Sequence, residues 1–470
     1  MKNRKILIIG MCALILFVSV AYAADLIIGK DVYYDNSSSL LKSKNIQDAL
    51  DELYSKASDL TSCSKEVAVP NLTDGLIPVT IADDGTVTYA DTSKVWYNYC
   101  DKVWANAVIL NSGASYKVGD TIKESDIQSY FVWIPKYKYK LWNTGTASKN
   151  IHEIEIIFDT TDTTDVTGVS CKTPMTSGSS GNCKNGEYMT HPAFISMGVN
   201  GFWAGKFETG YNGATSATAA QVNSNDSSKI IVKPNSYSWR NLTVMNMFTA
   251  AYNYKRAMNS HMMKNTEWGA VAYLSHSKYG INAEVNINNN SSYKTGYSAL
   301  PSTNQQTYPG TYGDGTTYNN AYNTSIGYLA TTTGNISGIY DMSGGAHEYV
   351  AGYMNGQFGS SDFTEEIISN YNSKYYDKYS ASSTLSSYQY RILGDATGEM
   401  GPFYKYSNED NVSRWHNSWY GDSTDFVTQA YPWFFRGGYY ISGVLASQFL
   451  FARHTGGSSL NLSFRIVLTT

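Results

Sequence analysis

The chain has 470 residues, of which 42% are hydrophobic and only 16% carry a charge, and its formal net charge is −4. This length and apolar content are enough to bury a substantial core, whereas the weakly acidic balance and the lack of a basic cluster beyond the N-terminus exclude an electrostatic nucleic-acid partner. Because Tyr reaches 40 residues while charges are few, solubility must depend on hydroxyl and amide groups.

The first 23 residues have the pattern of an export signal. Basic residues within the first five positions precede an apolar run over 6–20, and a small-x-small cleavage site ends at Ala23. We expect export with cleavage after Ala23. An uncleaved membrane anchor is the alternative, because the apolar run approaches the roughly 20 residues that span a bilayer. Either outcome places the protein at the cell surface or outside the cell.

Four of the five cysteines follow this signal, and an even number in an exported chain favours two disulfides. Cys171 and Cys183 enclose a Gly/Ser-rich loop and form the expected first pair, which leaves Cys63 to pair with Cys100. A metal site is the weaker interpretation, because neither CxxC nor HxxxH spacing occurs in the sequence.

Residues 24–62 are expected to form a short stalk. Within it, segment 45–60 carries apolar residues at spacings of three and four, behind Asn45 as N-cap, which predicts an amphipathic helix. The segment also resembles short modules that precede surface or tail-fibre domains, which are often oligomeric. The helix therefore either packs on its own domain or mediates homo-oligomerisation.

Residues 63–130 alternate short strand-like runs, at 77–81, 86–90 and 104–110, with turns rich in Asp, Gly, Asn and Ser. This pattern predicts a β-rich linker or subdomain, and we expect no catalytic or binding site in it.

From residue 131 onward the sequence predicts a mixed α+β domain that extends to residue 470. Strands are expected at 131–135 and 201–209, and helices at 238–254 and 266–276. The polar segment 279–334 is too irregular for a core layer, and such a length is usually functional or held by an ion or by side-chain packing.

Seven phrases follow one another in this region: FVWIP, GFWAGKFET, SWR, NTEWGAVAYL, GIYDMSGGAHEY, FFRGG and SFRIVL. Their order resembles that of the formylglycine-generating-enzyme, or sulfatase-modifying-factor, branch of the C-type-lectin-like fold. The resemblance covers about 131–468, with insertions at 159–190 and 355–432. It implies an α+β domain with few helices, long loops and small antiparallel sheets.

The resemblance does not imply that this chain has the oxidase activity of the family. Family members hold copper(I) with two cysteine thiolates shortly after the RGG motif, but the stretch after Gly438 reads YYISGVLAS. His347 also replaces the first tryptophan of the family's VWEW phrase. We therefore expect no copper and no enzymatic activity. The sequence also lacks GxSxG, GxxxxGK[ST] and HExxH signatures of other catalytic classes.

The resemblance does imply a structural calcium site. Its ligands would be Asp341, Gly344, Ala346 and Glu348, which supply the carboxylate and carbonyl oxygens that Ca²⁺ prefers. The alternative is a Gly-rich turn in which the two carboxylates cap backbone amides.

Domains of this branch also display binding residues on a fixed frame, as in the variable proteins of diversity-generating retroelements. In the closing stretch, 433–468, the expected frame consists of Arg436, Gly437, Gly438, Phe449, Phe451, Phe464 and Arg465. The expected contact residues are Tyr439, Tyr440, Ser442, Val444, Gln448, His454, Ser458, Ser459 and Asn461. Tyr with small polar residues is typical of a paratope. The alternative is that they are ordinary strand and loop residues.

These observations together predict an exported bacterial or phage surface protein, similar to an adhesin, whose C-terminal domain binds a surface glycan or a protein receptor without catalysis. A structural role in a pilus or tail is one alternative, and a formylglycine-generating-type oxidase is another.

Overall fold

The computed structural model describes residues 33, 42–53, 67–144, 150–160, 183–299, 320–380, 392–400 and 419–470. The chain divides into two compact units, 1–65 and 66–470. The predicted export signal lies outside the described residues. None of the helices in the described ranges is both long enough and apolar enough to cross a membrane.

In the first unit, residues 46–53 are helical. The helix begins as predicted, because the backbone N–H of Asp48 donates to the Asn45 side chain at 2.8 Å, which is an N-cap bond. The rest of the predicted helix, 54–60, lies outside the described residues, and oligomerisation through it stays a prediction. Apolar residues that remain 39% to 49% exposed are Ile46, Leu50 and Leu53.

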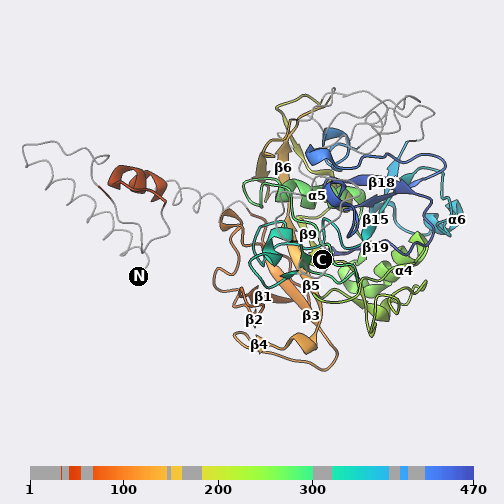
Figure 1. The fold of residues 1–470 in the computed structure, drawn as a ribbon, viewed down its shortest axis with the longest axis horizontal. Coiled ribbons are helices and arrows are strands. Elements are labelled where there is room, and N and C mark those ends of the chain that lie inside the picture. The colour runs from red at the N-terminus through yellow and green to blue at the C-terminus, as the bar shows by residue number, and fades with distance from the viewer. Residues whose placement is uncertain are drawn as a thin grey trace, which may run out of the picture. The chain divides into compact units, whose positions relative to one another are not determined.

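An eight-stranded sheet runs through the second unit (Figure 1). Its strands, in spatial order, are β12 (His261–Met262), β20 (Ile466–Leu468), β9 (Gly201–Gly205), β5 (Ile127–Pro135), β3 (Asn106–Leu110), β1 (Ile77–Ile81), β2 (Val87–Tyr89) and β4 (Thr121–Ile122). All of its pairings are antiparallel.

The expectation of a separate subdomain over 63–130 is therefore wrong. Strands β1 to β4 extend the same sheet beyond β5, and β3 pairs with β5 through Ala107 and Phe131, both fully buried. The boundary between the two compact units lies before this region and not after it, and the second unit begins at residue 66. The strand pattern itself was predicted correctly, but its alternation did not reveal that these strands share their sheet with residues 127–135.

A second, five-stranded sheet holds most of the C-terminal stretch. It contains β16 (Asp377–Tyr379), β15 (His347–Met354), β17 (Trp433–Arg436) and β18 (Phe451–His454) in this order, and β19 (Leu462–Phe464) pairs with β15. In the register, Glu348 of β15 faces Arg436 of β17. The chain passes from β19 of this sheet to β20 of the larger sheet through a single residue, Arg465.

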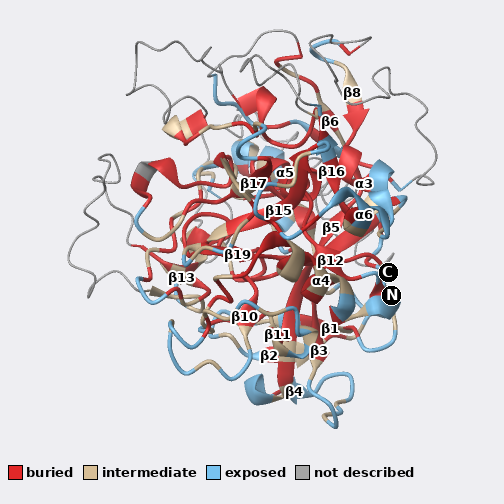
Figure 2. Ribbon diagram, turned by 90° about the vertical axis from the view of Figure 1, so that its right-hand side faces the viewer, coloured by how far each residue is buried: buried red, intermediate tan, exposed pale blue. Residues whose placement is uncertain are grey.

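Smaller elements surround the two sheets. Three strands, β6 (Tyr137–Lys140), β7 (Ile156–Phe158) and β8 (Tyr188–Thr190), form one further sheet, and two-stranded pairs are β10 (Gly210–Tyr211) with β11 (Ile230–Ile231) and β13 (Tyr297–Ser298) with β14 (Asn320–Ala321). The α-helices of this unit are α3 (Pro192–Met197), α4 (Val244–Tyr254), α5 (Asn265–Ser275) and α6 (Glu365–Ser369). The architecture is thus mixed α+β with few helices, as expected, and buried residues run through its centre along β5 and β15 (Figure 2).

The two predicted helices differ in how well they match. Helix α5 agrees with the prediction within one residue, and all of its residues are buried. Helix α4 begins six residues later than predicted, at Val244. Ser238 and Trp239 instead make backbone hydrogen bonds to Tyr293 and Thr209, respectively, so they belong to the loop network.

Cys100 and Cys183 are both disulfide-bonded. Cys63 and Cys171 lie outside the described residues, so the predicted pairing stays a prediction.

Arg465 lies at the joint between the two sheets and is fully buried. Its Nε donates to Glu348 Oε2 at 3.0 Å, and its Nη2 also donates to the other oxygen of that carboxylate. The remaining guanidinium protons reach the carbonyls of Gly205 and Tyr340 at 2.9 and 3.0 Å. One side chain therefore connects β9, β15 and the loop before β15, in the bidentate geometry that makes such pairs strong.

Replacing Arg465 by Met is expected to lower the free energy of unfolding by about 3–5 kcal/mol, because it leaves Glu348 charged and buried without its partner. Arg453→Met is the matched control. Arg453 contacts Asp425 at 3.0 Å near the surface, and its loss should cost about 1 kcal/mol or less. Urea unfolding of the three proteins measures both values, and equal losses in the two variants would refute the assignment of Arg465 as the joint.

Candidate ligand-binding face

The closing stretch separates into buried and partly exposed positions, as the frame hypothesis requires. All seven frame residues are buried, with Arg436, Phe449, Phe451, Phe464 and Arg465 at 0% exposure. Six of the nine expected contact residues are partly or fully exposed: Tyr439, Tyr440, His454, Ser458, Ser459 and Asn461.

Two expected contact residues are wrongly placed by the sequence analysis. Ser442 is buried, and its Oγ accepts a hydrogen bond from the backbone N–H of Tyr439 at 3.0 Å, so it stabilises the turn after β17. Gln448 is 0% exposed, which removes it from the surface. The side chain of Val444 lies outside what the structure describes. Single residues in loops carry no periodic signal that would reveal their burial.

Five rings form a continuous series at this face, which we call the aromatic row. In spatial order they are Phe435, His347, Tyr439, Tyr440 and Tyr293, and successive ring centroids lie 4.5, 4.7, 5.6 and 4.9 Å apart. Four of the rings are half-buried, and Tyr293 is 8% exposed. Such spacing is typical of favourable aromatic contacts. The row joins the loop after β17 to β15 and to the polar segment that follows α5.

Tyr293 anchors one end of the aromatic row. Its hydroxyl donates to the side-chain oxygen of Asn461, and the Arg240 guanidinium carbon lies 3.7 Å from its ring centroid. Arg240 in turn donates to the carbonyls of Leu460 and Ala217. These contacts hold the ring of Tyr293 in a fixed position.

Three residues of this face were not predicted from the sequence: Tyr293, Phe435 and Arg240. Tyr293 belongs to the polar segment 279–334, far from the closing stretch in sequence, and only the fold brings the two together. His347, which stands where the resembled family has a tryptophan, is a member of the row. Burial lowers the pKa of His347 to about 3, with a smaller effect from His454, so the ring is neutral at physiological pH.

His454 is partly exposed at the end of β18 and is not one of the rings of the row. Its Nδ1 is hydrogen-bonded to the Tyr349 hydroxyl, and the two ring centroids lie 5.7 Å apart. Burial lowers the pKa of His454 as well. It contributes polar surface next to the row and no ring contact within it.

The residues expected to bind calcium are close together in the chain but already have other partners. Asp341 accepts hydrogen bonds from the backbone N–H of Gly296 at 2.9 and 3.1 Å and from the Asn288 side chain at 2.9 Å. Glu348 is occupied by Arg465. Gly344 and Ala346 lie in the turn between the two carboxylates. Asp341 fits the alternative of a carboxylate that caps backbone amides. Glu348 instead pairs with Arg465 and would have to release it to join a calcium cage.

The same turn depends on a buried carboxyl that sequence analysis did not single out, Glu208. Its Oε1 accepts from the Ala346 backbone N–H at 2.7 Å, and its Oε2 accepts from the Ser238 hydroxyl. A Cβ at Gly345 would lie only 2.3 Å from Glu208 Oε1, so a glycine is required there. Burial, followed by repulsion from Asp341 and Glu348, raises the pKa of Glu208 well above its ordinary value.

The described residues contain no group of three or more His, Cys, Asp or Glu side chains arranged to hold a metal ion. No protein-family model and no curated protein matches the chain. The resemblance to the formylglycine-generating enzymes therefore stays a prediction.

Glu208→Gln is expected to flatten the pH dependence of stability. Because the native carboxyl has the higher pKa, the native state holds more protons than the unfolded state above the ordinary value of 4.5, and stability falls as pH rises from there. An amide avoids this loss and still fits, since Ser238 Oγ also lies 3.1 Å from the Tyr293 carbonyl and can donate to it instead. Urea midpoints at pH 5 and pH 8 should differ less in the variant than in the wild type; an equal or larger difference would contradict the prediction.

Proposed function

We propose that this protein is an exported surface protein whose second unit binds a ligand through the aromatic row, without catalysis. The observation that carries the proposal is the division of the closing stretch. Buried arginines, glycines and phenylalanines hold the backbone, while tyrosines and small polar residues between them remain at the surface.

The chemistry of the row supports binding. Partly exposed Tyr rings offer a contact area at a low cost in side-chain entropy, and the nearby Ser and Asn residues offer hydrogen bonds. Tyr439 and Tyr440 are also tied to the frame, since the Tyr440 backbone N–H donates to the Gly345 carbonyl at 3.0 Å.

Two ligand classes fit such a face, a surface glycan and a protein receptor. A sugar presents apolar ring faces and hydroxyl groups, which match Tyr rings beside Asn461, Ser458 and Ser459. A protein receptor would bury the same tyrosines as anchor residues. The row carries no formal charge at neutral pH, because its rings are Phe, Tyr and a His of low pKa.

A structural role in a pilus or tail is the second candidate, and the partly exposed apolar residues of helix 46–53 favour it. The oxidase alternative has less support, because the stretch after Gly438 contains no cysteine to hold copper.

Tyr439→Ala and Tyr440→Ala are each expected to weaken ligand binding about tenfold or more, the effect of losing roughly 1.4 kcal/mol of contact energy. Tyr431→Ala is the matched control, because Tyr431 is 45% exposed but lies outside the row. The purified protein is screened on a glycan array and, in parallel, against displayed cell-surface proteins, and affinities of the hits are measured by surface plasmon resonance.

A ligand that binds both row variants as tightly as the wild type would contradict the proposal. Recovery of filament proteins alone, with affinity that does not change in the row variants, would favour the structural role instead.

A further inference from the structure

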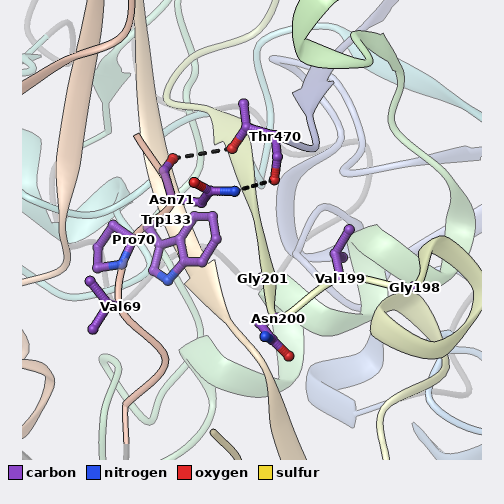
Figure 3. Close-up of a pocket in the computed structure, with 9 residues that line it drawn as sticks. All are labelled: Val69, Pro70, Asn71, Trp133, Gly198, Val199, Asn200, Gly201 and Thr470. Atoms are coloured by element: carbon purple, nitrogen blue, oxygen red, sulfur yellow. Dashed lines mark hydrogen bonds between the residues drawn. The ribbon is translucent and has the colours of Figure 1, made fainter. Parts of the chain in front are cut away.

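A cavity that contains none of the predicted site residues lies within the second unit (Figure 3). Its walls are segment 69–71, Trp133 of β5, Thr470, and segment 198–201, which leads from α3 into β9. The cavity has a volume of about 520 Å³, and small-molecule sites usually enclose roughly 300–1,000 Å³. It is therefore large enough for one small ligand.

Hydrogen bonds from two strands fix the wall that segment 69–71 forms. The indole N–H of Trp133 in β5 donates to the Ala68 carbonyl at 3.0 Å, and that of Trp203 in β9 donates to the Asn71 carbonyl at 2.7 Å. The Thr470 hydroxyl also donates to the Asn71 carbonyl, at 3.1 Å, and Asn71 Nδ2 donates to the Thr470 carbonyl (Figure 3). The backbone of this wall is thus tied to the large sheet and to Thr470.

The floor of the cavity is packed, and its reachable apolar surface lies at the sides. A Cβ at Gly201 would lie 2.2 Å from a ring carbon of Trp133, so the indole rests directly on the backbone of β9. Trp133 is only 1% exposed. The apolar surface that a ligand can contact comes mainly from Val69, which is 77% exposed, and from Val199, which is partly exposed.

The polar side chains of the cavity are neutral. They belong to Asn71, Asn200 and Thr470, and none of the lining side chains carries a charge. In Figure 3, Asn71 and Thr470 lie on one side of the Trp133 indole and Asn200 lies on the other. Asn71 and Asn200 are both exposed, and the structure shows only one side-chain hydrogen bond for the two amides, the bond from Asn71 to Thr470. The rest of their donors and acceptors can bond to a ligand.

We propose that this cavity binds a neutral, hydroxyl-rich ligand, namely a single sugar unit. Each sugar hydroxyl both donates and accepts hydrogen bonds, which matches the amide groups of Asn71 and Asn200. The C–H faces of a sugar ring match the side chains of Val69 and Val199. A charged ligand fits less well, because no lining side chain supplies a counter-charge for it.

The sugar site is separate from the aromatic row, because the two share no residue. The proposal therefore does not depend on the proposed function. Failure of one leaves the other standing, since variants of the row and variants of the cavity are tested independently.

Saturation-transfer-difference NMR of the purified protein tests the proposal, with the methyl glycosides of glucose, galactose, mannose and N-acetylglucosamine as probes. We expect at least one of them to bind. Asn200→Ala and Asn71→Ala should each weaken its binding about tenfold, because each removes hydrogen-bonding groups from the cavity. Asn253→Ala is the matched control, since Asn253 is exposed on α4 and does not line the cavity, and it should bind like the wild type.

Asn200→Ala decides the question if Asn71→Ala does not fold, because Asn71 also holds Thr470. The proposal is overturned if none of the four glycosides binds the wild type. It is equally overturned if binding is unchanged in Asn200→Ala and lost in Tyr440→Ala, which would place the sugar on the aromatic row, or if it is unchanged in all of these variants.

Discussion

The buried pair of Arg465 and Glu348 is the interaction on which the rest of the second unit depends. Arg465 is the only residue between β19 and β20, so it lies where the chain leaves one sheet and enters the other. Its guanidinium binds a carboxylate and two carbonyls from separate segments. A single charged side chain therefore fixes the relation of both sheets, and the turn that carries Gly345 and supports Tyr440 is positioned by the same network.

This arrangement shows what some of the few charged residues of the chain do. Several of the few charges are inside the protein, where they hold loops and strands together, as Arg240 and Glu208 do. Burial is tolerated because each of these two groups has hydrogen-bond partners.

Much of the fold could be predicted from local patterns, and the site could be predicted in part. Strand 77–81 and helix α5 were predicted correctly because alternation and capping depend only on residues that are close together in the sequence. The division of 433–468 into frame and contact positions followed from residue type, since Gly and Phe favour burial there. Tyr293 and Glu208 were missed because their roles arise from contacts between distant segments. The merging of β1 to β4 into the main sheet was missed for the same reason.

We propose that residues 433–468 combine a fixed frame with a surface that tolerates substitution. Saturation mutagenesis of this stretch, with surface display sorted for folded protein, tests it most directly. We expect broad tolerance at Tyr439, Tyr440, Ser458 and Ser459 and strong depletion of substitutions at Arg436, Gly438, Phe464 and Arg465. Tolerance at the arginines equal to that at the serines, or depletion at both sets alike, would contradict it.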